Sequence, residues 1–565
     1  MTTFEAEPPD ARAGRWYTTP VVAATALAGV LHLAWFLFVA NSGGDLAAQD
    51  AWADFATRHP DSAYNLAWYG GMHPVSYSVL SPYVMSLLGV RTTMMVAGTV
   101  SAAATALILM RTRAVRNTLA CSLAAVFALL CNALSGRVTF GLGLMFALGA
   151  VAAVFCRPRP GPPRRWWARR GARAVVAGLL SGVATAASPV AGLFLGVVAA
   201  ALFLNGRRAA SYTLGVPPVV VVAVSALLFP FSGTQPMGFG TAVLPLVFGV
   251  LTLLLVPRAW RTVRTAAALY AVGTLLTWLI DSQIGSNVTR LPMLFAGVVL
   301  LAALPYAARR VRYGLLAALV VFHAWVGFKS VDDVVLTAPH ASWTDEAAPL
   351  VEELRRRGAE RARVEVLPAR SHRESSALAP YVNLARGWNR QADIERNPLF
   401  YDDTLNADTY RAWLHRWAVR YVVLSTGASP DTGAQREKAL IEAGLPYLDL
   451  VWSDANWRLY AVRDATSLAG PTAAVDRAGA DGMTLRVAKP GRILIKVPYS
   501  PWLSLVDEKG ERLTAGTAGG GQPCLRRSEE TGEGDEWTEL DAPAAGVYRL
   551  AAPYTLFPRG TPCAP

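Results

Sequence analysis

Charged residues are scarce in this sequence. They make up 16% of its 565 residues, against roughly a quarter in an average soluble protein, and only five of them are lysines. Hydrophobic residues reach 53%, and the mean hydropathy is +0.31. This composition excludes an ordinary soluble enzyme and predicts a membrane protein with many hydrophobic spans.

The net charge of +13 is carried almost entirely by arginine. A basic protein can bind nucleic acid when its cations gather in a patch. Here the arginines stand in short clusters between hydrophobic spans, which is the pattern that the positive-inside rule produces. We therefore predict no nucleic-acid partner and interpret the excess of arginine as a topology signal.

The N-terminal region lacks the short hydrophobic core and small-residue cleavage site of a secretory signal peptide. Residues 21–40 instead form a hydrophobic stretch that is long enough to cross a bilayer and to stay there. Arg12 and Arg15 precede this stretch, so the N-terminus should be cytoplasmic. Since the arginine-rich, lysine-poor composition is typical of bacteria, we expect a multi-pass protein of the bacterial plasma membrane.

About eleven hydrophobic spans are expected between residues 21 and 328. One further segment, 75–89, is short and contains Pro82, so it either crosses the membrane or re-enters it from the outer side. If it re-enters, all later arginine clusters are cytoplasmic, and the chain after Lys329 is extracytoplasmic. These clusters lie at 111–116, 157–170, 207–208, 258–264 and 309–312.

Two extracytoplasmic parts are expected to follow the membrane domain, which we assign to residues 1–329. Residues 330–467 alternate amphipathic helices with short strands and predict an α/β domain. Residues 468–565 contain short alternating strands separated by glycine and proline, and they predict a small β-sandwich of a kind that can bind carbohydrate. Within it, the glycine-rich stretch 514–534 is expected to be a mobile loop.

Cysteine is also rare, with five residues in the chain. Cys121, Cys131 and Cys156 lie in hydrophobic spans or at their ends, and we interpret them as small apolar residues. Cys524 and Cys563 are the only pair expected outside the membrane, where oxidising conditions allow a disulfide. We predict that they are bonded; the alternative is two free thiols.

The loop after the first span, residues 41–74, carries many ionisable groups for a membrane edge. Such groups are costly near lipid and usually functional, so we interpret this loop as a catalytic face outside the membrane. Its candidates for catalysis or sugar binding are Asp45, Asp50, Trp68, Tyr69 and His73. As alternatives, Asp45 caps a helix over 47–57, and the two aromatic residues anchor the loop at the membrane interface.

Two arginines at the outer ends of spans are candidate ligands for a lipid phosphate. Arg290 follows the polar stretch 281–289, and Arg137 precedes the span 138–155. An external arginine runs against the positive-inside trend, and its planar guanidinium group suits a phosphate. The alternative is that both side chains anchor their helices at the interface by snorkelling.

In the predicted α/β domain, residues 381–401 combine planar polar side chains with aromatic rings. Arg386, Arg390 and Trp388 are candidate residues for binding the acceptor or a sugar, because guanidinium groups and aromatic faces suit sugars and phosphates. The alternative is a polar loop that packs against the membrane domain and is held by ion pairs.

Together these features resemble the GT-C superfamily of polytopic membrane glycosyltransferases, and its actinobacterial branch in particular. The resemblance rests on the acids Asp45 and Asp50 of the first loop, on His73 before Pro74, on the sequence Gly-Ser-Asn-Val-Thr-Arg at 285–290 and on the C-terminal ectodomain. The two acids are five residues apart, whereas the family has tight Asp-Asp, Asp-x-Asp or Glu-x-Asp pairs.

The resemblance implies transfer of a sugar, usually with inversion, from a polyprenyl-phosphate donor to a cell-envelope glycan or lipid acceptor on the outer face. Asp45 matches the family's general base best, and Asp50 is the second candidate. Arg290, Arg137 and His73 would stabilise the charge that develops on the leaving phosphate. A divalent cation, Mg²⁺ or Mn²⁺, held by Asp45 or Asp50 with a histidine would add to this stabilisation.

Two other functions are compatible with the sequence. A transporter or flippase of lipid-linked sugars also has many spans, but such proteins place charges at mid-membrane and show internal repeats, and this sequence shows neither. A non-catalytic scaffold of envelope assembly would use the β-sandwich to bind polysaccharide. The partners expected of the enzyme are a lipid-linked sugar, a cell-envelope glycan and membrane lipids.

Overall fold

The computed structural model describes residues 19–40, 43–112, 114–156, 170–338, 343–514, 521–529 and 536–563. Arg12, Arg15, Arg113 and most of the 157–170 cluster lie outside these ranges, as do parts of the stretch 514–534. The chain divides into two compact units. The first comprises residues 1–40, 91–224 and 236–334, and the second comprises 41–90, 225–235 and 335–565.

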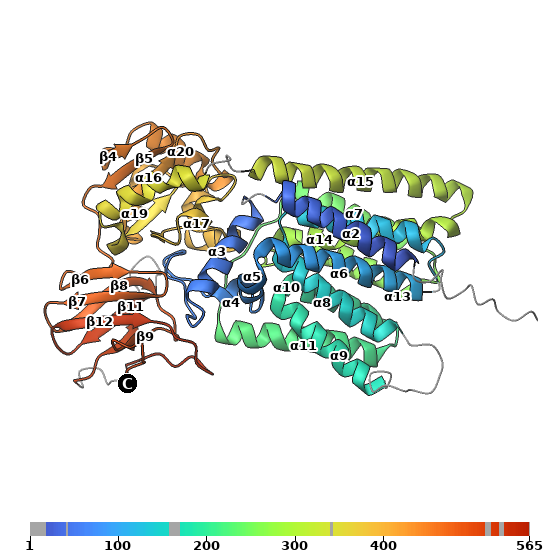
Figure 1. Ribbon diagram of the computed structural model, residues 1–565, viewed down its shortest axis with the longest axis horizontal. Coiled ribbons are helices and arrows are strands. Elements are labelled where there is room, and N and C mark those ends of the chain that lie inside the picture. The colour runs from blue at the N-terminus through green and yellow to red at the C-terminus, as the bar shows by residue number, and fades with distance from the viewer. Residues whose placement is uncertain are drawn as a thin grey trace, which may run out of the picture. The chain divides into compact units, whose positions relative to one another are not determined.

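The first unit is helical (Figure 1). Its helices in the described ranges are α2 (Thr19–Phe38), α6 (Val90–Arg111), α7 (Thr118–Leu134), α8 (Val138–Phe155), α9 (Arg170–Ala187), α10 (Pro189–Leu204), α11 (Arg208–Leu228), α12 (Phe239–Leu255), α13 (Arg261–Leu279), α14 (Arg290–Ala303) and α15 (Arg309–Thr337). Among the described residues, six segments are long and apolar enough to cross a membrane: α2, α6, α8, α11, residues 285–306 and α15. The predicted helical membrane architecture is confirmed, while the count of about eleven spans stays a prediction.

Helices of this unit approach closely where small residues face one another. A Cβ atom at Gly98 of α6 would collide with the buried ring of His32 on α2, so glycine is needed at this crossing. A Cβ atom at Gly143 of α8 would likewise lie 2.7 Å from the Cβ atom of Ser188. Small residues at such positions permit the tight helix packing that is typical of membrane interiors.

The second unit contains an α/β domain with one five-stranded sheet of order β2-β1-β3-β5-β4. Strand β1 runs parallel to β2 and β3, whereas β5 is antiparallel to β3 and β4. The strands are β1 (Arg363–Val366), β2 (Asn383–Leu384), β3 (Val419–Ser425), β4 (Leu448–Ser453) and β5 (Trp457–Val462). The helices are α16 (Trp343–Arg356), α17 (Glu374–Ala377), α18 (Arg390–Arg396), α19 (Ala407–Arg416) and α20 (Gln435–Glu442).

The same unit ends in a β-sandwich of two antiparallel sheets, with strand orders β10-β11-β8 and β6-β7-β12-β9. The strands are β6 (Ala473–Ala478), β7 (Gly482–Val487), β8 (Gly491–Pro498), β9 (Ser504–Val506), β10 (Cys524–Arg527), β11 (Trp537–Ala542) and β12 (Gly546–Ala551). Alternate residues of β8, Ile493, Ile495 and Val497, are buried in its core. Cys524 forms a disulfide with Cys563.

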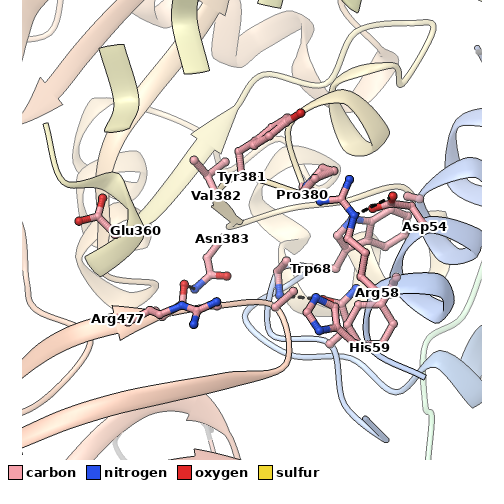
Figure 2. A pocket seen from close by; sticks show the side chains of 18 of the residues that line it. Asp54, Arg58, His59, Trp68, Glu360, Pro380, Tyr381, Val382, Asn383 and Arg477 are labelled. Atoms are coloured by element: carbon pink, nitrogen blue, oxygen red, sulfur yellow. Dashed lines mark hydrogen bonds and ion pairs between the residues drawn. The ribbon is translucent and has the colours of Figure 1, made fainter. Parts of the chain in front are cut away.

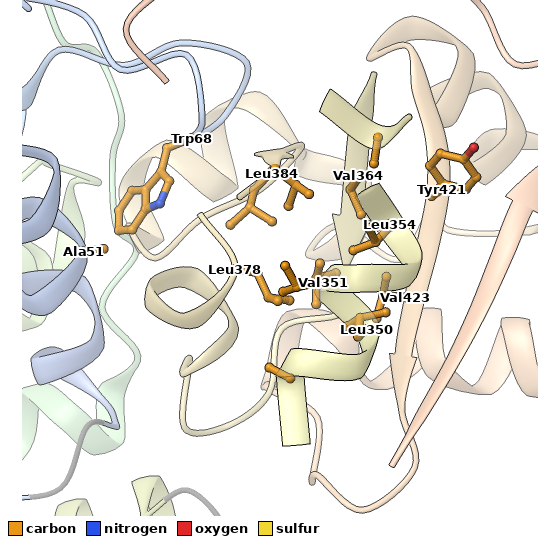
Figure 3. Packing of buried hydrophobic residues seen from close by; sticks show 14 of the residues in the cluster. Ala51, Trp68, Leu350, Val351, Leu354, Val364, Leu378, Leu384, Tyr421 and Val423 are labelled. Atoms are coloured by element: carbon orange, nitrogen blue, oxygen red, sulfur yellow. The ribbon is translucent and has the colours of Figure 1, made fainter. Parts of the chain in front are cut away.

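Residues 41–90 belong to this second unit, although we expected them in a membrane domain spanning 1–329. They form α3 (Asp45–Arg58), α4 (Pro74–Tyr77) and α5 (Ser81–Leu88). Figure 3 shows Ala51 and Trp68 from this segment at one side of the core of the α/β domain. Tyr64 from the same segment packs into the core of the sandwich. The first loop therefore contributes to the cores of both domains.

The segment 75–89 does not cross a membrane as a helix. Its longest helix, α5, has 8 residues, so it is about 12 Å long, against about 30 Å for the hydrocarbon core of a bilayer. Pro82 lies in its first turn, where proline is tolerated. Of the two alternatives for this segment, the structure thus excludes a single crossing helix.

Candidate functional site

Asp45 is the first residue of α3, and the start of that helix is fixed by two contacts. The N-cap residue is Gly44, with φ of 61°, and its N–H group donates a 2.7 Å hydrogen bond to the carbonyl oxygen of Ser371. A Cβ atom at Gly44 would lie 2.9 Å from the hydroxyl oxygen of Thr337. The alternative in which Asp45 itself caps the helix is therefore wrong, because Gly44 occupies the cap position.

Asp45 and Asp50 are both half-buried on α3, but they point in different directions. Five residues along an α-helix correspond to a rotation of about 140° between side chains. The two carboxylates therefore do not converge on one ion, and a divalent cation held by Asp45 or Asp50 with a histidine stays a prediction. Among the described residues, one group of three with metal-ligand spacing is found, Cys524, Asp541 and Cys563, and its two cysteines are consumed by the disulfide.

The turn beside Ser371 holds a buried cluster of ionisable groups. His372 has φ of 53°, a strained value for a residue other than glycine, and its ring stacks on Trp388 with 3.4 Å between ring centroids. Its Nδ1 lies 3.5 Å from Glu374 Oε1, and its Nε2 lies 3.7 Å from Asp431 Oδ1. We call His372, Glu374, Trp388, Asp431 and Arg390 the His372 cluster.

The His372 cluster contains polar atoms that the described residues leave unsatisfied. The Oε2 atom of Glu374 is buried without a hydrogen-bond partner among these residues, and its Oε1 atom has only the 3.5 Å contact with the Nδ1 of His372, which lacks hydrogen-bond geometry. Such atoms are rare in folded proteins and often mark a functional site. Together with the backbone strain at His372, they make this cluster, next to the start of α3, the best candidate site in the second unit.

The His372 cluster includes two residues that the sequence predicted for a binding site, Arg390 and Trp388. The guanidinium group of Arg390 donates to both oxygens of Asp431, at 2.7 and 3.0 Å, and lies 5.2 Å from the centroid of the Trp388 ring. Burial alone would raise the pKa of Asp431, but the hydrogen bonds from Arg390 and the nearby His372 outweigh burial and hold that pKa well below its ordinary value.

Arg386 does not bind a sugar, and that prediction is corrected. Its side chain is 1% exposed and is surrounded by three carboxylates: Asp393 at 2.9 Å, Glu437 at 2.9 Å and Glu365 at 3.5 Å. Burial raises the pKa of Glu437 to about 7, because the carboxylate loses its hydration, although Arg386 opposes that shift. Arg386 is therefore the centre of a structural ion-pair network inside the α/β domain.

Trp68 and Tyr69 are core residues, with 1% and 0% of their surface exposed. Trp68 Nε1 donates to the carbonyl oxygen of Ser375 at 3.3 Å. The Tyr69 hydroxyl donates to the carbonyl oxygen of Asn389 and accepts from the N–H group of the same residue. Tyr69 offers no free ring face to a sugar, whereas Trp68 also lines a cavity of the second unit, so its role in sugar binding stays a prediction. Because both residues lie in the core, their interpretation as anchors at the membrane interface is corrected.

His73 is also built into the structure and is not available to a phosphate. Its Nδ1 donates to the carbonyl oxygen of Ala63 at 2.7 Å, which leaves Nε2 to accept from the hydroxyl of Ser500 at 3.1 Å. Burial lowers its pKa to about 4, so the ring is neutral at pH 7. A neutral ring with both nitrogens engaged does not stabilise a leaving phosphate, and this prediction is corrected.

The buried imidazole of His73 predicts a loss of stability in acid. Between pH 6.5 and about 4 the unfolded chain binds a proton at this residue and the folded protein does not, so the free energy of unfolding falls as the pH drops. The expected loss is about 3 kcal/mol across this window. Thermal unfolding midpoints of the wild type should fall more steeply with acidification than those of His73→Gln. Equal slopes would contradict this prediction.

Arg290 and Arg137 lie at the starts of two helices of the first unit. Arg290 is the first residue of α14, and its guanidinium carbon lies 5.3 Å from the centroid of the Phe140 ring. Arg137 is the N-cap residue of α8, one turn before Phe140, and lies 3.4 Å from Asp333. The two helix starts are therefore close to each other, and they carry two cations at one end of this unit.

Sequence reasoning missed His372, Glu374 and Asp431. A signal was present in the polar run Ser-His-Arg-Glu-Ser-Ser at 371–376, which follows strand β1. A histidine and a glutamate two residues apart after a strand are candidates for a site at a sheet edge. Nothing local indicated that Asp431 would face them.

Comparisons with known proteins give partial matches. Residues 470–565, the β-sandwich, match a family described as a domain of unknown function, DUF8823. No match is found among curated proteins. The solved structure of the arabinofuranosyltransferase AftD from Mycobacteria is similar with a TM-score of 0.46 at 17% identity, over 86% of this chain and 41% of that one.

An oligosaccharyltransferase from Archaeoglobus fulgidus, solved with a tethered acceptor peptide, is similar with a TM-score of 0.44 at 12% identity, over 73% of this chain and 69% of that one. The same archaeal enzyme has been solved in complex with Zn and sulfate, and that structure covers 78% of this chain. The chain thus spans about two fifths of the length of the arabinofuranosyltransferase. Similarity at this level does not define a function.

Proposed function

We propose that this protein is a membrane glycosyltransferase that moves a sugar from a polyprenyl-phosphate donor to a cell-envelope glycan or lipid. The reaction takes place on the outer face of a bacterial plasma membrane, with the N-terminus in the cytoplasm. The observation that carries the proposal is the position of Asp45. Asp45 begins helix α3. The residue before it, Gly44, is hydrogen-bonded to Ser371, which is next to His372 and close in sequence to Glu374.

A base must be held within reach of the proton that it abstracts. The helix start that carries Asp45 is fixed by backbone contacts, so its carboxylate can be aimed at an acceptor hydroxyl without a large entropy cost. The His372 cluster beside it offers unsatisfied acceptors and an imidazole for positioning that acceptor. In this proposal Asp45 takes the proton, and Asp50, on another side of the helix, does not.

The leaving group is a lipid phosphate, and its charge requires cationic or hydrogen-bond-donating groups. Arg290 and Arg137 supply this charge in the helical unit, where a lipid-linked donor would lie. A guanidinium group binds two phosphate oxygens at once, which fixes the orientation of the donor as well as its charge.

Replacement of Arg290 by glutamine is expected to raise the KM for the lipid-linked donor by about 10- to 100-fold, because a hydrogen bond to a charged group contributes about 1.5–3 kcal/mol. The matched control is Arg261→Gln, since Arg261 also begins a helix of the first unit, α13, but at the end predicted to be cytoplasmic. Steady-state kinetics with varied donor concentration measure the KM of both variants. Equal KM values in the two variants would remove Arg290 from the donor site.

The experiment that tests the function uses the purified protein in detergent with added lipid. Short-chain polyprenyl-phosphate arabinose, mannose and galactose are each incubated with envelope glycan fragments, and the corresponding nucleotide sugars serve as comparison donors. Transfer from one lipid-linked sugar and from no nucleotide sugar is the expected result. Transfer from a nucleotide sugar alone would overturn the donor class. A protein that binds the glycan but transfers nothing would be the scaffold described above.

A further inference from the structure

A cavity of about 330 Å³ lies inside the second unit. Its lining comes from the first loop (α3 and residues 59–68), from the α/β domain (Arg355, Glu360 and the segment 379–383) and from the segment 477–480 of the sandwich. The lining residues of α3 are Ala51, Asp54, Phe55 and Arg58, which recur at helical spacing. Asp45 and Asp50 are not among the lining residues, so this cavity is distinct from the start of the helix.

The lining of the cavity mixes charged and polar side chains with apolar ones, among them the rings of Tyr381, Trp68 and Phe55. Figure 2 shows Tyr381 above the cavity, Arg477 and Asn383 toward one side, and Arg58 with His59 toward the other. Tyr381 is 43% exposed, and the guanidinium carbon of Arg355 lies 5.3 Å from the centroid of its ring, which helps to hold the ring in place. Amide, guanidinium and carboxylate groups thus surround a ring that can stack on a ligand.

The charges around the cavity largely balance. Arg58 pairs with Asp54 at 2.9 Å, His59 lies 3.1 Å from Asp481, and Glu360 lies 3.3 Å from Arg361. A strongly anionic ligand gains little from such a site, and an apolar ligand would leave these groups desolvated without partners. Hydroxyl groups both donate and accept hydrogen bonds, so a polyhydroxyl ligand with a flat apolar face fits the lining best.

We propose that this cavity binds one or two sugar rings of the acceptor glycan, at a distance from the base. Its volume lies at the lower end of the range for small-molecule sites, about 300–1,000 Å³. Along the axis of α3 the lining residues lie about 10–20 Å from Asp45. A chain of several sugars is needed to bridge that distance. The site would act as a remote anchor whose binding energy positions the reacting hydroxyl.

The acceptor role of this cavity rests on the proposed function, whereas the binding of a glycan does not. Binding is therefore measured directly, by calorimetry on the full-length protein in detergent. The probes are linear di- and hexasaccharides of arabinose, mannose and galactose. The variants are Tyr381→Ala, Arg477→Ala and Ala379→Trp, the last of which fills the cavity. The matched control is Arg463→Ala, an exposed arginine paired with Asp449 that does not line the cavity.

One of the three hexasaccharides is expected to bind with equal affinity to the wild type, to the Arg463→Ala control and to Asp45→Asn. Each cavity variant should weaken this binding by about tenfold or more, which is about 1.4 kcal/mol. In the transfer assay the wild type should prefer the hexasaccharide to the disaccharide, and the cavity variants should lose this preference while they still act on the disaccharide.

Failure to bind any of the six probes, or unchanged binding in all three cavity variants, would overturn the proposal. A loss of binding in the cavity variants without a change in the length preference would overturn the acceptor role. If the wild type binds the hexasaccharide through the cavity and transfers no sugar, the proposed function fails and the glycan site stands. Thermal unfolding midpoints of the variants, compared with that of the control, identify any variant that has lost its fold.

Discussion

Replacement of Asp45 by asparagine should reduce the rate of sugar transfer by about 100- to 10,000-fold, which is the usual contribution of a general base. Asparagine has the same shape as aspartate but accepts no proton at neutral pH. The start of α3 is held by the hydrogen bond from the N–H group of Gly44 to the carbonyl oxygen of Ser371, a backbone contact that asparagine at position 45 leaves in place. The fold and the KM for the donor are therefore expected to be retained, and the loss should appear in kcat.

Asp50→Asn is the matched control for this experiment. It makes the same chemical change in the same helix, and Asp50 is half-buried like Asp45. The two side chains differ by a rotation of about 140° around the helix, so one acceptor hydroxyl does not reach both. The rate of the control should remain close to that of the wild type. The reverse result would make Asp50 the base, and full activity in both variants would remove α3 from the chemistry.

Replacement of Arg386 by methionine should lower the free energy of unfolding of the second unit by about 3–5 kcal/mol. Methionine keeps much of the side-chain volume but removes the charge that compensates Asp393, Glu437 and Glu365. All four side chains are less than a tenth exposed, so water does not replace the lost partner. Chemical denaturation followed by tryptophan fluorescence measures the change, because Trp413 donates to Asn397 beside this network.

Two further variants separate the charge effect from a packing effect. Arg463→Met removes an exposed arginine from an ion pair with Asp449 and should cost less than about 1 kcal/mol. Adding Glu437→Gln to Arg386→Met removes one of the uncompensated carboxylates and should recover part of the stability. If the double variant is no more stable than the single one, the cost comes from packing and the ion-pair explanation is wrong.

Local sequence patterns predicted the regular elements of the C-terminal half well. The alternating pattern of 468–565 predicted short strands separated by turns, and the structure shows strands β6 to β12 there. Strand β10 lies inside the stretch 514–534 and β11 follows it, so the expectation of a loop over that whole stretch is wrong at 524–527. Its glycine and charge content pointed to a loop because composition reports average exposure and not pairing.

The site was harder to predict because its parts are distant in the sequence. The acids of the first loop drew attention to α3, but the same reasoning treated residues 62–74 as exposed, and they are buried throughout. His73, Trp68 and Tyr69 have the residue types of a binding site and serve as core residues. His372 and Glu374 approach the start of α3 through a contact between Gly44 and Ser371, which no local pattern encodes.

The shared core has a consequence for how the protein is made. Trp68 bonds to Ser375, 307 residues later in the chain, so the first loop leaves the ribosome long before the partners of its core exist. During synthesis Trp52, Trp68 and Tyr69 lack the packing partners that the C-terminal half supplies until the chain beyond the last helix of the first unit has been made. A chain truncated near residue 330 would keep these aromatic residues uncovered permanently. Such uncovered apolar surface favours aggregation while a chain is being made, and completion of the C-terminal half removes it.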